Sequence, residues 1–566
     1  MQIQPTYLSM NSLLTGRLFR IPEYQRSYSW LTKQREDLFE DLRKLGATGH
    51  NTEHFMAAVV GVRRKKIRIQ AEQFDLVDVV DGQQRLTTIA ILLKALAKAL
   101  DRTEPVQLRL AEDLDRLLVK RDETSPLLIQ TNQDLSNVFS DYMQKGAHPS
   151  PSDAVTAADR NLLEAMEECE RFVDEWEARG RGALIDLLDL LKNRLTLILH
   201  EIEDEGLVYT VFEVLNSRGL DVTWFDKLKS LLMAIVFEKG GGNKAATITQ
   251  LHRIWRDIYR TIGLRQLLNR ETLRFAGTLR SKSRPNRPLD EETAVGELIE
   301  ACQRSPRRVV DLSNWLLSVT RAEDRVHGNR RWRGVTRIVQ ARLVAIAVLL
   351  RSFPADQEEE ILRCWESVTF RIYGMAGEDA RAHVGDYVRL AWSIINEKLS
   401  PEAIGDGLRE IGKDHPVRQA ARQLVNANCY ENWTEELRYF FFRYEEYLAG
   451  KLGQDLNQSQ WNKIWSEEAS SSVEHIRPQS TGSWSASTSG IYVHRLGNLV
   501  LLPPRVNSRL KASSPREKAK TYEACGLFAA TEVAKLLKRN GGKWSRSIVE
   551  QREQALVRWA TREWAD

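Results

Sequence analysis

The chain has 566 residues and a net charge of +5, and 42% of its residues are hydrophobic while 28% are charged. This length exceeds what one hydrophobic core normally holds, so we expect about two to four domains. The composition is that of a globular protein with a large core, which excludes an extensively disordered chain. No apolar run approaches the roughly 20 residues that span a bilayer, and residues 1–4 do not begin a signal peptide. We therefore expect a cytoplasmic protein without a membrane partner.

The positions of the cysteines and of the basic residues indicate which kinds of site the chain could contain. The cysteines lie far apart without a Cys-x-x-Cys pair, which favours reduced, structural thiols over a zinc or redox site. Basic residues cluster at 63–68, 280–287, 330–337 and 505–520, as expected for contacts with a phosphate backbone. Each cluster is also compatible with a solvated surface. The five cysteines are Cys169, Cys302, Cys364, Cys429 and Cys525.

The N-terminal region alternates short apolar runs with helical patterns. Strands are predicted at 54–62 and 74–80, joined by a basic turn and followed by a helix at 85–100. Proline and serine mark a loop at 146–153. A mixed α/β domain is expected, because the later patterns predict a strand at 195–202 and helices at 154–179, 183–192 and 207–215.

The middle of the chain is predicted to be almost wholly helical. Thr223 and Asp226 have the spacing of a capping box that starts a helix, and the glycines at 240–242 end it. Amphipathic helices continue to about residue 428, with a loop rich in proline and arginine at 281–288. Residues 435–450 form a helix rich in tyrosine and phenylalanine, which we interpret as a docking helix for the C-terminal domain. Stacking on nucleic-acid bases is the alternative.

A motif near the C-terminus is the strongest indication of a catalytic site in the sequence. Residues 472–479 read Ser-Val-Glu-His-Ile-Arg-Pro-Gln, residues 494–502 read His-Arg-Leu-Gly-Asn-Leu-Val-Leu-Leu, and Asn507 follows. A carboxylate, a histidine and an amide oxygen are the groups that one hard cation and a water-activating base need to hydrolyse a phosphodiester. Strands are predicted at 473–478 and 494–502. A helix is predicted from Ser514, which has capping-box spacing to Glu517.

The order strand, long loop, strand, helix resembles the ββα-metal fold of HNH endonucleases, and the 473–479 motif is similar to theirs. The resemblance implies that His475 is the general base, that Glu474 and Asn507 bind Mg²⁺ or Mn²⁺, and that Asn498 completes the catalytic set by bracing the hairpin loop. His494 is the second candidate for the base. The alternative is a structural histidine accompanied by two turn asparagines. Side chains that could contact flanking phosphates are Arg495, Arg505, Arg509 and Lys511.

A second motif, Asp81-Gly82-Gln83-Gln84-Arg85, follows a predicted strand and opens a predicted helix. Free N–H groups and the dipole at a helix start attract an anion, glycine lets a phosphate approach closely, and Arg85 adds a charged fork. The motif is therefore a candidate cradle for nucleotide phosphates. The alternative is local, because Asp81 and Gln84 also have capping-box spacing. The chain has no Walker-type sequence, so this nucleotide site would not be a P-loop.

Three N-terminal segments carry a resemblance to a known domain. They are residues 21–30 (Ile-Pro-Glu-Tyr-Gln-Arg-Ser-Tyr-Ser-Trp), the 81–85 motif, and residues 212–219 (Phe-Glu-Val-Leu-Asn-Ser-Arg-Gly) with Asp226 and Lys229. Together they resemble the GmrS-like domain, which has a ParB/sulfiredoxin-like fold. The C-terminal motif, with residues 437–446 before it, resembles the GmrD-like HNH domain. The whole chain resembles single-chain GmrSD-type, modification-dependent (type IV) restriction endonucleases and their SspE-like and BrxU-like phage-defence relatives.

The resemblance implies that the N-terminal domain binds and hydrolyses a nucleoside triphosphate, GTP or ATP. Tyr24, Gln25 and Arg26 would line the same site or read a DNA modification. For Tyr24, Tyr28 and Trp30, core packing is the alternative. The residues implied to contact the nucleotide are Asp81, Gly82, Gln83, Gln84, Arg85, Asn216 and Arg218.

We therefore expect a multidomain α+β protein with a GmrS-like domain at 1–240, an α-helical spacer at 241–430 and a GmrD-like HNH nuclease domain at 431–566. The leading hypothesis is a nucleotide-regulated, Mg²⁺-dependent endonuclease of phage defence that cleaves or nicks modified or foreign double-stranded DNA. One alternative is a ParB-like, nucleotide-dependent DNA-binding switch whose HNH fold does not cleave. Another is an unregulated nuclease toxin. Whether the chain forms a homo-oligomer stays open.

Overall fold

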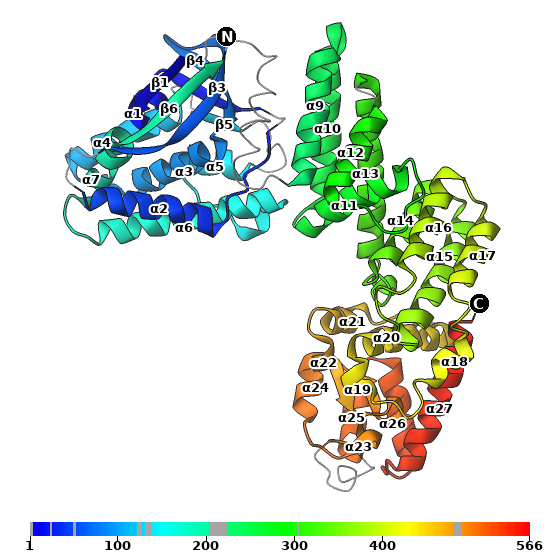
Figure 1. Ribbon diagram of the computed structural model, residues 1–566. Coiled ribbons are helices and arrows are strands. Elements are labelled where there is room, and N and C mark those ends of the chain that lie inside the picture. The colour runs from blue at the N-terminus through cyan, green and yellow to red at the C-terminus, as the bar shows by residue number, and fades with distance from the viewer. Residues whose placement is uncertain are drawn as a thin grey trace. The chain divides into compact units, whose positions relative to one another are not determined.

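The computed structural model describes residues 4–22, 25–48, 53–120, 127–130, 137–202, 223–302, 305–479 and 490–565 (Figure 1). The chain divides into two compact units. The first holds Met1–Gly277 and Asp290–Arg321, and the second holds Thr278–Leu289 and Ala322–Asp566. The domain boundaries expected at residues 240 and 430 stay predictions.

A six-stranded sheet forms the centre of the first unit, in the order β1-β6-β3-β4-β2-β5. The pairs β1-β6 and β3-β4 are antiparallel, whereas β3-β6, β2-β4 and β2-β5 are parallel. A mixed sheet with helices between its strands confirms the α/β character predicted for this region. The strands are β1 (Gln4–Ser9), β2 (Arg17–Ile21), β3 (His54–Ile69), β4 (Glu72–Asp81), β5 (Leu128–Gln130) and β6 (Leu195–Ile202).

Helix α3 (Gln83–Ala99) forms the core of this unit. It lies beneath the sheet, with α2 and α6 on its other side (Figure 1), and almost all of its side chains are buried. A helix that is apolar around its circumference must be enclosed in this way. The other helices are α1 (Met10–Leu14), α2 (Thr32–Gly46), α4 (Pro105–Leu118), α5 (Val138–Lys145), α6 (Ala157–Glu177) and α7 (Ala183–Asp189), with a π-helical turn at Leu190–Arg194. The helix predicted at 207–215 lies outside the described residues.

The basic turn predicted between the first two strands is wrong. Its basic residues belong to β3, and the turn comes later, at Gln70 and Ala71. The run is stable as a strand because its charges pair across the sheet: Arg64 Nε lies 2.7 Å from Asp78 of β4, and Arg63 lies 2.7 Å from Glu201 of β6. Much of this cluster is therefore neutralised within the sheet.

The region after Thr223 is helical, as predicted. The Thr223 hydroxyl caps α9 by accepting a hydrogen bond from the backbone N–H of Asp226, and α9 ends before the three glycines. The loop predicted at 281–288 separates α11 from α12. The helices are α9 (Trp224–Lys239), α10 (Lys244–Ile262), α11 (Gln266–Arg280), α12 (Glu291–Cys302) and α13 (Pro306–Gly328).

The second unit is helical around a two-stranded antiparallel sheet of β7 (Val473–His475) and β8 (Leu499–Leu501). Its first helices are α14 (Val339–Arg351), α15 (Ala355–Thr369), α16 (Val384–Asn396), α17 (Pro401–Ile411), α18 (Val417–Arg422), α19 (Cys429–Asn432), α20 (Thr434–Leu452) and α21 (Gln458–Trp465). The remaining ones are α22 (Ala469–Ser472), α23 (Gly490–His494), α24 (Pro504–Leu510), α25 (Pro515–Ala524), α26 (Phe528–Arg539) and α27 (Arg546–Glu563).

The aromatic helix predicted at 435–450 is α20, and most of its rings are core residues. Phe440 packs edge-on against Trp559 of α27 with ring centroids 5.1 Å apart, and it stacks on Trp564. Tyr439 and Phe440 are fully buried, so neither presents a face to a nucleic-acid base. The helix docks the C-terminal part of the chain, as its composition predicted.

The C-terminal strand-helix order was predicted correctly in outline and wrongly in detail. Residues Gly490–His494 are helical and Leu496–Asn498 form a 3₁₀ turn, so the strand predicted at 494–502 is only Leu499–Leu501. A helix that was not predicted, α24, follows β8 directly, with Pro504 in its first turn. The predicted capping box of Ser514 and Glu517 is present and starts α25.

The five cysteines are free thiols, and four of them are buried. Within the described ranges, none of the helices combines the length and the apolar character needed to cross a bilayer.

Candidate functional site

The C-terminal motif lies on β7, where Glu474 pairs with Val500 and His475 pairs with Leu499 of β8. Adjacent residues of a strand project to opposite faces. The Glu474 carboxylate accordingly faces α25, whereas the His475 ring faces Tyr430 of α19 and His494 at the end of α23. The motif therefore places a carboxylate and an imidazole at adjacent positions of a three-residue strand, each with its own set of partners.

The Glu474 side chain is buried, and one of its carboxylate oxygens has two polar partners. Its Oε1 lies 2.6 Å from Lys518 Nζ and accepts a 3.0 Å hydrogen bond from the Tyr522 hydroxyl, both on α25. Burial raises the pKa of Glu474, and the charge and hydrogen bonds of Lys518 and Tyr522 oppose that rise. Neither partner was anticipated. Their spacing of four residues puts them on one helix face, but nothing in the sequence shows which strand that face meets.

His475 is surrounded by two polar side chains and one ring. Its Nε2 lies 3.2 Å from His494 Nδ1 and 3.2 Å from Gln479 Nε2, and its ring centroid is 4.4 Å from that of Tyr430. Burial lowers the pKa of His475 to about 3, and the nearby His494 and Lys518 add to that effect. The imidazole is therefore neutral at pH 7.

Asn498 is completely buried and uses its whole amide to hold the loop between the two strands. Its Oδ1 accepts hydrogen bonds from the Arg477 backbone N–H and from Trp544 Nε1, each at 3.0 Å. Its Nδ2 donates to the backbone carbonyls of Arg477 and Val493. The bracing role expected for Asn498 is thus what the structure shows, and any part it plays in catalysis is through the position of this loop.

Asn507 lies on α24 and is tied to the chain that leads into β7. Its Nδ2 donates to the backbone carbonyls of Ser471 at 2.9 Å and Val473 at 3.1 Å. Both bonds use the amide nitrogen, so Oδ1 faces away from these carbonyls. The structure thereby orients an amide oxygen beside the strand that carries Glu474.

The basic side chains predicted to grip phosphates fall into two groups. Arg505, Arg509 and Lys511 are exposed on or just after α24, the helix of Asn507. Arg495 is instead buried and forms an ion pair with Glu553 of α27. The surroundings of Arg495 do not support the predicted phosphate contact, because its guanidinium already has a buried carboxylate partner.

In the first unit, the Asp81–Arg85 motif forms the predicted strand-turn-helix junction. β4 ends at Asp81, and Gly82 adopts a φ of 92° before α3 begins at Gln83. A Cβ on Gly82 would lie 2.9 Å from Val59 Cγ2, so a side chain is excluded there by both conformation and space. The alternative of an Asp81–Gln84 capping box is wrong, because Gly82 is the capping residue and the Gln84 amide bonds elsewhere.

The two glutamines of the motif hold the segment at residues 25–29. Gln83 Nε2 donates to Gln25 Oε1 at 3.1 Å, and Gln25 Nε2 donates to the Val80 carbonyl at 2.8 Å. Gln84 accepts from the Ser29 N–H and donates to the Ser27 carbonyl. Both glutamines are buried, so they position this segment. Arg85 and Asp81 remain partly exposed. Tyr24, Asn216 and Arg218 lie outside the described residues.

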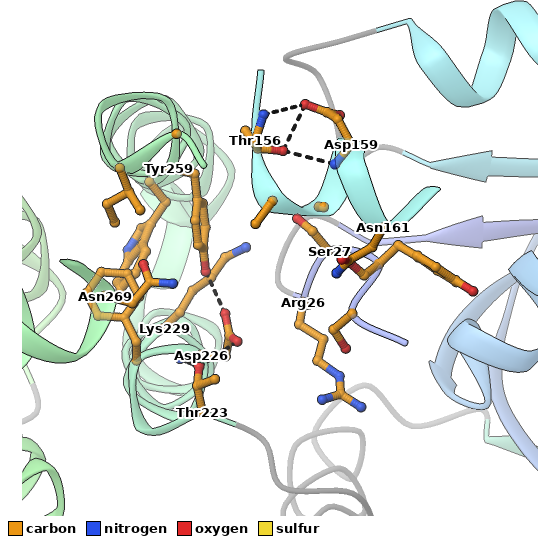
Figure 2. Close-up of a pocket in the computed structure, with 18 of the residues that line it drawn as sticks. Arg26, Ser27, Thr156, Asp159, Asn161, Thr223, Asp226, Lys229, Tyr259 and Asn269 are labelled. Carbon is orange, nitrogen blue, oxygen red and sulfur yellow. Dashed lines mark hydrogen bonds between the residues drawn. The ribbon is translucent and has the colours of Figure 1, made fainter. Parts of the chain in front are cut away.

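A cavity of about 950 Å³ lies next to this segment, lined by residues 26–31, the start of α6, and helices α9, α10 and α11 (Figure 2). Arg26, Lys229, Asp226 and Tyr259 face it. The Tyr259 hydroxyl donates to Asp226 Oδ1 at 2.7 Å, and Lys229 Nζ donates to the Gln25 carbonyl at 3.3 Å. Arg26 and Lys229 thus contribute positive charge to the lining, and Asp226 contributes a carboxylate that Tyr259 holds in place. Further charged side chains of the lining are Arg253, Arg256, Arg270, Asp159 and Glu291.

Burial governs the charges in this cavity. It lowers the pKa of Lys229 to about 8, with the Asp226 charge opposing the shift. It also lowers the pKa of Arg26, against which both Asp226 and Asp81 act. Arg26 therefore links the 81–85 motif electrostatically to Asp226. Tyr259 was missed because its helix was taken for a spacer.

Comparison with protein families identifies both ends of the chain. Residues 10–233 match a family model described as the GmrSD restriction endonuclease N-terminal domain. Residues 414–559 match the model of the GmrSD restriction endonuclease C-terminal domain. The first match contains the 81–85 motif and Lys229, and the second contains β7, α24 and α25. Among curated proteins, no sequence matches the chain.

Proposed function

Because the chain belongs to the GmrSD family of restriction endonucleases, we propose that it is a nucleotide-regulated, metal-dependent endonuclease of phage defence that cuts modified or foreign double-stranded DNA. Catalysis is assigned to the C-terminal site around His475, and nucleotide binding to the N-terminal cavity around Lys229. The observation that carries the catalytic assignment is the antiparallel β7-β8 pair, which bears Glu474 and His475, with Asn507 on the following helix hydrogen-bonded back to β7.

An HNH (ββα-metal) arrangement is supported by the order of these elements. β7 and β8 pair, and α24 follows with its Asn507 side chain hydrogen-bonded back to Val473 of β7. Asn498 ties together Arg477, just after β7, and Val493, shortly before β8. The arrangement is held by hydrogen bonds within this part of the chain.

The oxygen donors present suit a hard divalent cation, Mg²⁺ or Mn²⁺. Glu474 would contribute a carboxylate oxygen and Asn507 its Oδ1, which faces away from the carbonyls that bind its nitrogen. When bound, the cation would stabilise negative charge on the phosphate and on the leaving oxygen. Lys518 already lies at Glu474 Oε1, so the other carboxylate oxygen, Oε2, is the one that the Lys518 and Tyr522 bonds leave for a ligand.

The proton from the attacking water would go to His475. Its Nε2 lies 3.2 Å from both His494 and Gln479, which leaves Nδ1 as the less occupied nitrogen and the proposed acceptor. Tyr430, packed edge-on against the ring, keeps the imidazole from rotating. Arg505, Arg509 and Lys511 would contact flanking phosphates.

The N-terminal cavity has the size and charge expected of a nucleotide pocket. A volume of about 950 Å³ lies within the usual range for sites that bind small molecules. Arg26 and Lys229 supply positive charge for phosphates, and the half-exposed Arg85 lies on α3 next to the same segment. GTP and ATP are the candidate ligands, and the ParB/sulfiredoxin-like domain is the proposed fold.

Cleavage assays with purified protein test the proposal. Unmodified, glucosylated-hydroxymethylcytosine and phosphorothioate DNA are each incubated with Mg²⁺, with and without GTP or ATP. His475→Ala should abolish cleavage, and His148→Ala, which changes an exposed histidine of the first unit, should not. If wild type cuts no substrate, or if His475→Ala cuts at the wild-type rate, the catalytic assignment is wrong. Nucleotide-dependent binding without cutting would favour a DNA-binding switch, and cutting regardless of nucleotide or modification would favour an unregulated nuclease.

A further inference from the structure

Lys518 contacts both residues of the Glu-His motif at once. Its Nζ lies 2.6 Å from Glu474 Oε1 and donates a 2.7 Å hydrogen bond to the His475 backbone carbonyl. The side chain has no exposed surface. A buried ammonium is costly unless a carboxylate and other acceptors surround it. The contact is therefore part of the packing of β7 against α25.

Two donors converge on the same carboxylate oxygen of Glu474. The Tyr522 hydroxyl, one turn after Lys518 on α25, donates to Oε1 at 3.0 Å. Both bonds use Oε1, and neither Lys518 nor Tyr522 occupies Oε2. An oxygen ligand is thus held in one orientation by partners outside the coordination sphere, as is common around metal sites.

We propose that Lys518 is a positioning residue that serves as the internal counter-ion of Glu474 until a divalent cation binds there. The inference rests on the proposed function, since it takes Glu474 as a metal ligand. Lys518 has two effects: it holds the carboxylate in place, and its charge repels an incoming cation. Repulsion between a monovalent and a divalent cation sharing one buried carboxylate outweighs the gain from orientation, because Tyr522 still orients the carboxylate when the lysine charge is removed.

We therefore expect Lys518 variants to lose thermal stability and to gain affinity for the metal. Lys518→Met keeps a side chain of similar length and removes the charge, so the metal-free protein should unfold at a lower temperature. The same variant should bind Mn²⁺ about tenfold more tightly than wild type, because the metal becomes the only cation beside Glu474. Lys518→Gln, which can still donate to the His475 carbonyl, should show the same tightening with a smaller loss of stability.

The test uses full-length protein freed of metal with a chelator and contains no nucleotide or DNA. Free Mn²⁺ is measured by electron paramagnetic resonance during a titration, and the thermal unfolding midpoint is followed in parallel. Tyr522→Phe is the matched control, because it removes the other bond to Oε1 and keeps the lysine. Its Mn²⁺ affinity should stay within about twofold of wild type.

Glu474→Gln separates failure of this inference from failure of the proposed function. If Glu474→Gln loses the Mn²⁺ site and both Lys518 variants bind Mn²⁺ no more tightly than wild type, the counter-ion role is overturned and the metal assignment stands. A tightening of equal size in Tyr522→Phe also overturns it, since a lost hydrogen bond and not a lost charge would then explain the effect. If Glu474→Gln binds Mn²⁺ as wild type does, both proposals fail together.

Discussion

The C-terminal site and the N-terminal cavity differ in how their polar groups are satisfied. In the C-terminal site the key groups already have protein partners: Glu474 has Lys518, and Asn498 has Trp544. In the cavity, Lys229 has the Gln25 carbonyl and Asp226 has Tyr259, but these side chains also border an open volume of about 950 Å³. A site whose atoms hold one another has its geometry set by the chain alone, whereas a cavity is completed by its ligand. Under the proposed function, the groups assigned to catalysis are therefore positioned by the chain itself, whereas the groups assigned to control contact whatever enters the cavity.

The largest effect is expected at His475, where a substitution tests whether catalysis and nucleotide binding belong to separate sites. His475→Ala removes the proposed proton acceptor and should lower the DNA cleavage rate about 10³-fold, within the range for loss of a general base. Nucleotide binding should be unchanged, because the residue is not part of the cavity. Single-turnover cleavage and nucleotide titration of the same preparation measure both. A comparable loss in nucleotide affinity would show that the two functions do not separate as described.

The next effect compares two asparagines of the same site. Asn498→Ala leaves the buried N–H groups of Arg477 and Trp544 without an acceptor and should destabilise the protein by about 3 kcal/mol. Asn507→Ala, at a half-buried position, should cost about 1 kcal/mol while abolishing metal-dependent cleavage. Denaturant unfolding of the two variants decides between a bracing and a liganding role. Equal stability losses would contradict the division of roles.

In the cavity, the largest change is expected from Lys229→Met. Removing this buried cation should weaken nucleotide binding about 30-fold, the usual scale for a charged hydrogen bond to phosphate. Lys227→Met is the matched control, because Lys227 lies on the same helix and does not line the cavity. Isothermal titration with GTP and ATP measures both. If Lys227→Met weakens binding as much as Lys229→Met, general charge and not the cavity attracts the nucleotide.

The smallest effect is a pH dependence of nucleotide affinity, which we expect in the cavity and not in the C-terminal site. Burial lowers the pKa of Lys229 to about 8, so its ammonium is charged below that pH and loses its proton as the pH rises through it. An anionic nucleotide prefers the charged form, and its affinity should therefore fall about fivefold between pH 7 and pH 9. The affinity ratio of wild type to Lys229→Met cancels the titration of the nucleotide itself. A ratio that stays constant over this range would rule out Lys229 as a phosphate contact.

The difference between the two sites also explains how much of each could be predicted from the sequence. The Glu474-His475 motif, Asn507 and the Ser514 cap are close in sequence, and their spacing indicated a strand pair with a following helix. The partners of Glu474 and Asn498 could not be found in this way, because Lys518, Tyr522 and Trp544 carry no spacing signal relative to β7. The basic run at 63–68 was taken for a turn because cross-strand pairing with Asp78 and Glu201 is invisible in one segment.

The cavity was even less accessible to sequence reasoning. The 81–85 motif predicted a strand-turn-helix junction, and β4, Gly82 and α3 confirm it. However, Gln83 and Gln84 hold the 25–29 segment through bonds that span more than fifty residues of chain. Tyr259 of α10 reaches the cavity from a helix that the pattern marked only as amphipathic. A pocket assembled from segments that are far apart in the sequence leaves no local pattern to detect.

We propose above all that a nuclease in the second unit is controlled by the nucleotide cavity of the first. The most direct test is the ratio of DNA cleavage rates with and without nucleotide triphosphate, measured for wild type and for Lys229→Met at saturating Mg²⁺. The ratio should depart clearly from one in wild type, in either direction, and return to about one in Lys229→Met at nucleotide concentrations below its weakened Kd. A ratio of one in wild type, or the same ratio in both proteins, would contradict it.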